Sequence, residues 1–567
     1  MASNLQDWKK TLNDLQARLY EFNDEDYIEE SENRDDDRRQ IISGLAYAVE
    51  LVRRAEQSDH PDAPEIFKAV EKIIEETVRF ATEDDAYFDN MPSFGHGDKL
   101  ITDPLKKPAR GSLNVLYKMQ LLGQDTSNYE ERFPTLPHWV RSLQPPKATV
   151  FSRFRKPARG VTTTFPDIPP VAQYIYEARC EISPHDISIP LTMAMSSDCS
   201  AVVVSTMGGY KNRDPLLTFY LPQDPDPVFF RLKAGLCDHA RQLAMDESRK
   251  LVFAGDWQRI KSYSWALDAD KRRGLPTHTL KSDDHEGPIA VLGNRLIRAG
   301  GKGTALSWNI DELETHGTRN ENKIIGEGEF KEDSWRETGS PEQSPGSEPH
   351  SSIPFGEDGL KLRCWHLHKP TGHMLCGQTT QYTHEEVGLR CVGIDLEHGG
   401  KIVSKYIGHG DNVCTISTSE DDPSLFLTAA LDGYARLFDV RMTCPVMTFD
   451  YEHDDNKVQY KASAIYVHPG GIPSVFTGGD LNESIKFWDV RAGRTVYDLS
   501  TASQKMSDIN KTVKVPRFAE NDRKYYEDGA FRDRWPRDAY HDEDYYGSIF
   551  YSETDAFLAY RFMENPS

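Results

Sequence analysis

One short stretch of the sequence, CWHLHKPTGHMLC, gathers side chains that can bind a metal ion: Cys364, His366, His368, His373 and Cys376. Thiolates and imidazoles are common zinc ligands. Because alternate residues of a β-strand project to the same face, the first three would lie together. The spacing matches no zinc motif, however, and the residues between these side chains suit an ordinary strand. We therefore expect no metal and no other cofactor, with this cluster as the one metal candidate.

Motifs of catalysis are missing from the sequence. The glycine-rich pieces TMGGY (206–210) and RAGGKGTA (298–305) lack the Lys-Ser/Thr that completes a phosphate-binding loop. No nucleophile elbow, HExxH motif or protein-kinase signature is present. The sequence therefore predicts a protein that is not an enzyme.

The composition disfavours several classes of protein. The 90 acidic residues outnumber the 67 basic ones, and the net charge of −23 opposes binding to nucleic-acid phosphates but not to a basic protein tail. The eight cysteines form no CxxC pair, and neither an apolar signal segment nor a run of 18 apolar residues occurs. We expect an intracellular protein of the cytoplasm or nucleus, with no membrane contact and no direct contact with nucleic acid.

From about residue 171 the sequence consists of short β-rich runs that resemble one another. The clearest two are YARLFDVRM (434–442) and SIKFWDVRA (484–492), and five weaker relatives align with them. Four of the six intervals between aligned positions are 43 to 50 residues, close to the length of a four-stranded propeller blade. The aligned positions are Phe219, Trp265, Trp308, Ile394, Phe438, Trp488 and Tyr560.

The two longer intervals, of 86 and 72 residues, predict insertions. Trp365 lies too close to Ile394 to mark a further blade. Residues 315–352 and about 505–542 are polar and charged. We expect both to be inserts in a propeller region that spans 171–567.

The region before the repeats is predicted to be α-helical over 1–125, followed by a proline-rich basic linker over 126–170. Apolar residues near the start recur at steps of three and four, which places them on one helix face. This seam is too short for a stable coiled coil, so it favours a hairpin within the chain, and pairing with a partner's helix stays open. Asp62-Ala-Pro64 predicts the start of a later helix. The seam consists of Trp8, Leu12, Leu15, Leu19 and Phe22.

The repeats resemble the WD-repeat β-propeller family, through Trp488-Asp489 and through Gly408-His409 at the entry to the preceding repeat. The resemblance implies a mainly β, seven-bladed propeller. It also implies that a His, a turn Asp, a Ser or Thr and the Trp of a blade form a buried hydrogen-bonded set with a structural role. The sets are His239, Asp256 and Trp265; His409, Thr428 and Asp432, with Phe438 in place of Trp; and His453, Thr477, Asp480 and Trp488.

Closure of the ring is predicted from the two ends of the propeller region. Residues 171–182 alternate in polarity and precede the first repeat, whereas the last repeat, at Tyr560, lacks an outer strand. We expect these segments to pair, because pairing would remove two exposed sheet edges.

Two third strands end in Asp-x-Arg, at Asp439-Val-Arg441 and Asp489-Val-Arg491. This tandem box is similar to that of WD-repeat substrate receptors for cullin-type ubiquitin ligases. The similarity implies that Arg441 and Arg491 bind a ubiquitin-ligase adaptor, for which the planar guanidinium is well suited. The alternative is a structural arginine that braces neighbouring blades.

A second similarity covers one blade only, residues 407–440, which is similar to the EED-type propeller that binds a methylated histone tail. The residues of its aromatic cage have no assigned counterparts in this sequence. The main hypothesis is therefore a protein–protein interaction scaffold without catalysis. The alternatives are a ubiquitin-ligase substrate receptor and a reader of basic histone tails.

Overall fold

The computed structural model describes residues 7–23, 34–82, parts of 87–101, 179–182, most of 189–500 and 558–561. The largest gaps within 189–500 are 267–275, 316–345, 379–390 and 451–461. The predicted linker over 126–170 lies outside the described residues. So do most of the first predicted insert and all of the second.

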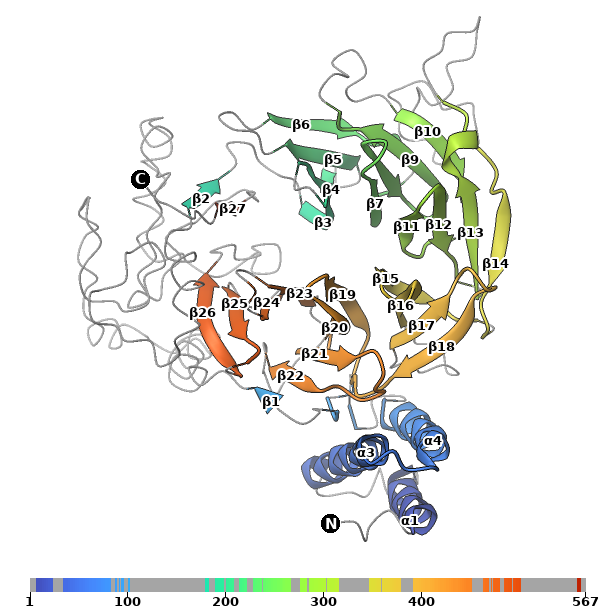
Figure 1. The fold of residues 1–567 in the computed structure, drawn as a ribbon, viewed down its shortest axis with the longest axis vertical. Helices are drawn as coiled ribbons and strands as arrows, with labels where there is room; N and C mark the ends of the chain where they lie inside the picture. The colour runs from blue at the N-terminus through green and yellow to red at the C-terminus, as the bar shows by residue number, and fades with distance from the viewer. Residues whose placement is uncertain are drawn as a thin grey trace, which may run out of the picture.

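Three helices form a bundle at the N-terminus (Figure 1). Helix α1 (Trp8–Tyr20) continues into the 3-10 turn η2 (Glu21–Asn23), and α3 (Arg34–Gln57) and α4 (Ala63–Thr82) follow. Helix α4 begins directly after Asp62, as predicted, with Pro64 in its first turn, where the missing N–H leaves no helical hydrogen bond unmade. The indole Nε1 of Trp8 donates to Asp62 Oδ2 at 2.9 Å and ties α1 to the start of α4.

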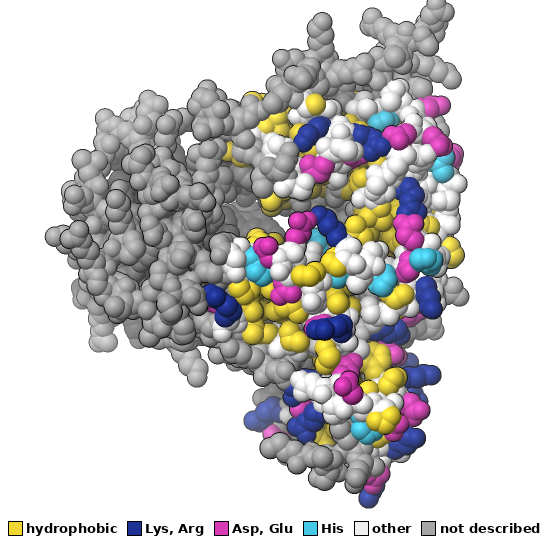
Figure 2. Space-filling view, viewed as in Figure 1, with side chains coloured by type: hydrophobic (Ala, Val, Ile, Leu, Met, Phe, Trp, Pro, Cys, Tyr) yellow, Lys and Arg dark blue, Asp and Glu magenta, His cyan; other side chains and the backbone are white. Residues whose placement is uncertain are grey.

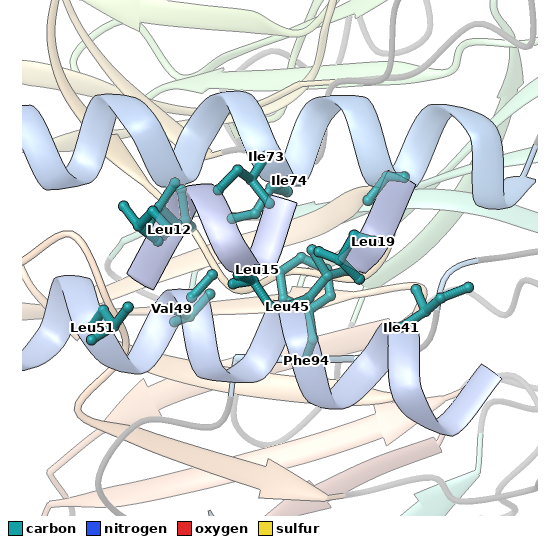
Figure 3. Close-up of a cluster of buried hydrophobic side chains, with 14 of the residues drawn as sticks. Leu12, Leu15, Leu19, Ile41, Leu45, Val49, Leu51, Ile73, Ile74 and Phe94 are labelled. Carbon is teal, nitrogen blue, oxygen red and sulfur yellow. The ribbon is translucent and has the colours of Figure 1, made fainter. Parts of the chain in front are cut away.

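The apolar seam of α1 is buried against the other two helices (Figure 3). Leu12, Leu15 and Leu19 each expose 8% or less of their surface and lie among side chains of α3 and α4. The apolar face of α1 is therefore buried within the chain, as the hairpin hypothesis predicted. None of the described helices is both long and apolar enough to cross a membrane.

The repeats form four-stranded antiparallel sheets arranged around a ring (Figure 1). In each sheet the first strand lies toward the centre and the fourth at the rim. Blade 1 contains β3 (Ile189–Met195), β4 (Val202–Gly208), β5 (Asp214–Leu221) and β6 (Val228–Lys233); blade 2 contains β7 (Gln242–Asp246), β8 (Leu251–Gly255), β9 (Arg259–Ser264) and β10 (Pro276–Lys281); blade 3 contains β11 (Ile289–Leu292), β12 (Arg295–Ala299), β13 (Thr304–Asn309) and β14 (Ser351–Pro354).

Three further blades complete the described part of the ring. The strand ends predicted from the repeats, from Phe219 to Trp488, all lie in a third strand or directly after one. The 86-residue interval holds an insertion, as predicted, because β14 completes blade 3 and β15 opens blade 4. Blade 4 contains β15 (Leu362–His368), β16 (His373–Gln378), β17 (Cys391–Asp395) and β18 (Lys401–Tyr406); blade 5 contains β19 (Val413–Ser419), β20 (Asp422–Ala430), β21 (Tyr434–Asp439) and β22 (Met447–Asp450); blade 6 contains β23 (Ala462–Val467), β24 (Ser474–Gly479), β25 (Ser484–Asp489) and β26 (Arg494–Ser500).

The prediction of seven blades is wrong, because the described residues form six. The seventh aligned position, Tyr560, lies in β27 (Leu558–Arg561), which among the described strands pairs with β2 (Arg179–Ile182) alone, in a two-stranded antiparallel sheet. The sequence pattern identifies only the third strand of a blade and gives no information on the other three strands. A strand with this pattern was therefore counted as a blade although it does not belong to a four-stranded sheet in the described residues. The predicted pairing between 171–182 and the last repeat is confirmed for the described residues, Arg179–Ile182 with Leu558–Arg561, and Figure 1 places this small sheet between blades 6 and 1.

The N-terminal region docks on blade 5. We call α1, η2, α3, α4 and the described residues of 87–101 the N-terminal module. Its strand β1 (Leu100–Ile101) pairs in parallel with β22, so it extends the rim of blade 5 to a fifth strand and covers that edge. The core of the helices also includes Ile407, in the link between β18 and β19, and Cys444, in the turn between β21 and β22. The module and blade 5 thus share one apolar core.

Candidate functional site

A buried arginine joins the N-terminal module to blade 5. Arg436 lies in the middle of β21 and is fully buried. Its Nη2 atom lies 2.5 Å from Asp432 Oδ2, and its Nη1 donates to Asp432 Oδ1 at 3.1 Å. Its Nε donates to the carbonyl of Gly95 at 3.2 Å, and Nη2 also donates to the hydroxyl of Ser93. One guanidinium therefore holds a turn of the blade and a segment of the module together.

The hydrogen-bond set of blade 5 is organised around this arginine. His409 Nε2 and Thr428 Oγ1 are 2.9 Å apart, as the WD-repeat resemblance implied, and Phe438 stacks on the imidazole at 5.4 Å. Asp432 accepts from Arg436 and from the amide of Gly410 at 2.7 Å. Within the described residues His409 Nδ1 has no hydrogen-bond partner. Burial, with the charge of Arg436 nearby, holds the pKa of His409 well below its usual value, so the imidazole is neutral.

Arg436 was not among the residues predicted from the sequence. A basic residue stands two positions before the Phe or Trp in both of the best repeats, as Arg436 and as Lys486, and both are buried. Each is paired across the sheet with a threonine of the second strand, Thr428 or Thr477. A basic residue at the same position in two apolar third strands is the pattern that marks this position.

Further polar contacts fix the helices to blade 5, through Thr443, and to blade 4, through Lys405 in β18. The carboxylate of Glu56, in the last turn of α3, accepts from Thr443 Oγ1 at 2.6 Å and from its amide at 3.2 Å. Burial raises the pKa of Glu56, against the opposing effect of these two hydrogen bonds. Glu71 of α4 accepts from Lys405 Nζ at 2.9 Å.

Two glycines pack against each other where the module meets the blade. A Cβ atom on Gly95 would lie 2.3 Å from the Cα atom of Gly408. Gly408 itself has φ +113°, a conformation that favours glycine. The Gly408-His409 pair therefore serves both the blade and its contact with the module.

The blade 6 set is described in part. Trp488 Nε1 donates to Thr477 Oγ1 at 2.8 Å, and both side chains are buried. His453 and Asp480 lie outside the described residues. The Trp–Thr half of the set thus has the geometry that the resemblance implied.

The blade 2 set is held mainly by the backbone. Asp256 is buried and accepts from the amides of Gln258 and Arg259, each at 2.8 Å. The amide of His239 donates to the carboxylate of Asp238 at 2.7 Å. Trp265 is buried, but its Nε1 has no hydrogen-bond partner among the described residues, in keeping with the lack of a hydroxyl in strand β8.

A second buried arginine links blades 2 and 3. Arg298, in β12, donates to Ser282 Oγ at 2.6 Å and to the backbone carbonyl of Asp256. Burial lowers its pKa to about 10, which still leaves it charged at neutral pH. This residue, too, was not predicted.

The predicted metal candidates have other partners. Cys364 Sγ lies 3.4 Å from the carbonyl of Val413, and Cys376 Sγ lies 3.3 Å from that of Met374. His373 sits opposite His368 in the β15–β16 pair. In the described part of the chain no group of three possible ligands is arranged to hold a metal ion.

Two of these histidines connect blade 4 to blade 5. His366 Nε2 and Thr418 Oγ1 are 2.8 Å apart, and His368 Nε2 lies 3.0 Å from the carbonyl of Pro423. Burial lowers the pKa of His366 to about 4, helped by the nearby His368 and Lys369. The segment considered as a metal candidate therefore contributes to the contact between blades 4 and 5.

The two Asp-x-Arg arginines lie at turns that follow third strands. The side chain of Arg441 is 77% exposed and forms a two-point pair with Asp439, with Nε–Oδ1 at 2.8 Å and Nη2–Oδ2 at 2.5 Å. The side chain of Arg491 is 41% exposed, and its Nη2 lies 3.7 Å from Asp489 Oδ2. Among the described residues, the polar contacts of Arg441 stay within its own turn and do not reach a neighbouring blade.

Comparison with known proteins finds similarity to solved structures alone. No family model matches the sequence, and no curated protein matches it. Similar solved structures include the WD40 β-propeller domain of Doa1, at 12% identity and a TM-score of 0.37, covering 57% of this chain and 86% of that one. U3-55K and the WD40 repeats of RRP9 both show 11% identity and a TM-score of 0.39; each covers 57% of this chain, and the match spans 85% and 84% of their own lengths. At these values the likeness concerns the fold alone, and the sheet order of the chain itself establishes the propeller.

Replacing Arg436 by Met should destabilise the protein by about 3–5 kcal/mol, because it leaves the carboxylate of Asp432 buried without its cation. The double variant Arg436→Met, Asp432→Asn should recover much of that loss, since neither side chain is then charged. Urea unfolding of the full chain measures both. Equal destabilisation of single and double variants would contradict the assigned role, and Arg441→Ala, at an exposed pair, serves as the control with an expected loss below about 1 kcal/mol.

Replacing Trp488 by Phe should cost about 1 kcal/mol more than replacing Trp265 by Phe. The two changes are chemically identical, but only Trp488 loses a hydrogen bond to a threonine within the described residues. The free energy of unfolding of each variant, from denaturant titration, is the measurement. A larger loss for Trp265→Phe would show that the indole N–H of Trp488 does not stabilise blade 6.

The stability difference between wild type and His366→Gln should shrink as the pH falls from about 6.5 toward 4. The pKa of His366 is lowered in the folded chain, so the unfolded chain binds the proton more readily and wild-type stability is lost over this range. A relative loss of about 1–2 kcal/mol between pH 7 and pH 5 is expected from the size of the shift. Urea midpoints of the two proteins measured across that range test this, and parallel pH curves would refute it.

Proposed function

We propose that this chain is a protein–protein interaction scaffold without catalysis. The observation that supports this proposal most is how the N-terminal module is fixed to blade 5. Arg436, the Glu56–Thr443 contact and a shared apolar core hold the two together. A bundle fixed to a ring in this way presents helix surfaces and blade turns in one constant arrangement, and preorganised surfaces bind with less loss of conformational freedom. On the face seen in Figure 2, basic and acidic side chains lie side by side on the ring and on the helices, which gives a partner polar groups of both signs.

Several side chains of the described region that could take part in acid–base chemistry make structural contacts instead. Arg436 and Asp432 neutralise each other in the interior, and His366 and His368 connect two blades. This supports the assignment of the chain to binding and not to catalysis.

A substrate receptor for a cullin-type ubiquitin ligase is the first candidate for the kind of scaffold. The exposure of Arg441 favours it, because an arginine that only braced blades would be expected to contact a neighbouring blade. Arg441 also lies two residues before Thr443, which α3 contacts, so an adaptor at this turn would be close to the helices. The histone-tail alternative stays a prediction, and its test is a panel of histone peptides.

Affinity purification with mass spectrometry tests the proposal directly. We expect the tagged full chain to retrieve specific proteins, and a receptor would retrieve a ligase adaptor among them. Arg441→Ala combined with Arg491→Ala should then reduce the adaptor at least about fivefold, since truncating an interface arginine commonly costs more than 1 kcal/mol. Arg241→Ala, at another exposed cation on blade 2, is the matched control.

The outcomes separate the two levels of the proposal. Retention of the adaptor by the double variant, or its absence from the wild-type sample, would exclude the receptor while other specific partners still support a scaffold. A wild-type chain that retrieves no protein above an untagged control would contradict the scaffold itself.

A further inference from the structure

Three consecutive blades carry the same device at the same place. Asp395, Asp439 and Asp489 are each the last residue of the third strand, in blades 4, 5 and 6. Each carboxylate accepts the backbone amide two residues later, from Glu397 at 3.1 Å, from Arg441 at 2.9 Å and from Arg491 at 2.8 Å. The same turn is thus closed in the same way three times.

Each turn also places a basic side chain against its carboxylate. In blades 5 and 6 this side chain is the arginine of the Asp-x-Arg box. In blade 4 it is His398, whose Nδ1 lies 2.7 Å from Asp395 Oδ2 and whose amide donates to Asp395 Oδ1 at 3.1 Å. The two Asp-x-Arg boxes therefore have a structural counterpart in blade 4, formed by Asp395 and His398. There the basic residue follows the Asp by three positions and not two, and it is an imidazole in place of a guanidinium.

In every pair the acid lies inside and the base outside. The side chains of Asp395, Asp439 and Asp489 are 18%, 13% and 3% exposed. Those of His398, Arg441 and Arg491 are 80%, 77% and 41% exposed. Solvent and any partner therefore meet the basic end of each pair.

Among the described blades, this turn follows the third strand in blades 4, 5 and 6 alone. The third strands of blades 1, 2 and 3 end at Leu221, Ser264 and Asn309, none of which is acidic. A feature that every blade needed in order to fold would recur in all of them. Blades 4, 5 and 6 are neighbours (Figure 1), and the N-terminal module sits on the middle one, so the three turns follow one another along one part of the ring.

The chemistry of these side chains selects the partner. Asp439 engages the Nε and Nη2 edge of Arg441, which leaves the Nη1 and Nη2 end of the fork pointing to other acceptors. That end of a guanidinium matches a carboxylate with two parallel hydrogen bonds. The chain as a whole carries a charge of −23, which repels an acidic partner at long range. Short-range contacts at outward cations would give such a partner its specific place.

We propose that the turns of His398, Arg441 and Arg491 form one docking row for an acidic surface of a partner protein. This rests on the proposed scaffold function and names the chemistry of one of its partners. It also assigns His398 a binding role that the sequence did not indicate.

The test uses the full chain and a simple acidic probe. Biolayer interferometry would compare an immobilised polyglutamate peptide of about ten residues with a polyglutamine peptide of equal length, at about 50 mM salt, where screening is weak. We expect the wild-type chain to bind polyglutamate and not polyglutamine. The triple variant His398→Ala, Arg441→Ala, Arg491→Ala should bind at least about fivefold more weakly, whereas Arg241→Ala should bind as the wild type does. His398→Arg should strengthen binding, because it makes the third charge permanent.

The results decide separately on the row and on the scaffold. Equal binding of the two peptides, or unchanged binding in the triple variant, would overturn the docking row. An unaltered affinity in His398→Arg, with the arginine variants weakened, would remove His398 from it. A chain that still retrieves its specific partners in either case remains a scaffold, so failure of the row is distinguishable from failure of the proposed function. Unchanged thermal unfolding of the variants shows that the exposed substitutions left the fold intact.

Discussion

The buried ion pair between Arg436 and Asp432 is the interaction on which the union of ring and helices depends. A charge in the protein interior costs several kcal/mol unless it is paired and its remaining hydrogen-bond sites are filled. Here the remaining donors of the guanidinium are filled by the Gly95 carbonyl and the Ser93 hydroxyl, both from the N-terminal module. Blade 5 alone would leave those donors without these partners. The module is therefore part of the structure of blade 5 and not an appendage to it.

The same pair accounts for the departures of blade 5 from the WD-repeat pattern. With Phe438 in place of Trp the indole donor is missing, yet His409 keeps its bond to Thr428 and stacks on the phenyl ring. The buried Asp432 takes a guanidinium and backbone amides. In blade 2 the corresponding carboxylate, Asp256, is held by backbone amides of its own turn, and Arg298 binds the carbonyl of the same residue. Arg436 thus binds the carboxylate of the turn Asp in its own blade, whereas Arg298 of blade 3 binds the backbone carbonyl of the turn Asp in blade 2.

The sequence predicted strands better than it predicted how many blades they build. Periodicity located the third strands because each has a buried aromatic or aliphatic side chain at or next to its end, as with Trp308 and Trp488. It also foresaw the pairing of the two ends of the propeller region, since polarity alternates in 171–182. The number of blades depends on strands of weaker pattern, which is why seven were expected. The role of Arg436 depends on a contact across more than 340 residues of chain, and a local pattern cannot show such a contact.

In the Asp turns of blades 4 to 6 the structural role falls on the acid of each pair, so it does not conflict with the binding role proposed for the base. The carboxylate of Asp439 stabilises the turn through the amide of Arg441, and that bond needs only the backbone N–H, which every residue except proline supplies. The guanidinium adds an exposed ion pair, and exposed pairs contribute about 1 kcal/mol or less to stability. Stability therefore constrains the acid while leaving the base available for binding. In the Asp439–Arg441 pair the acid stabilises the turn, and the base faces outward.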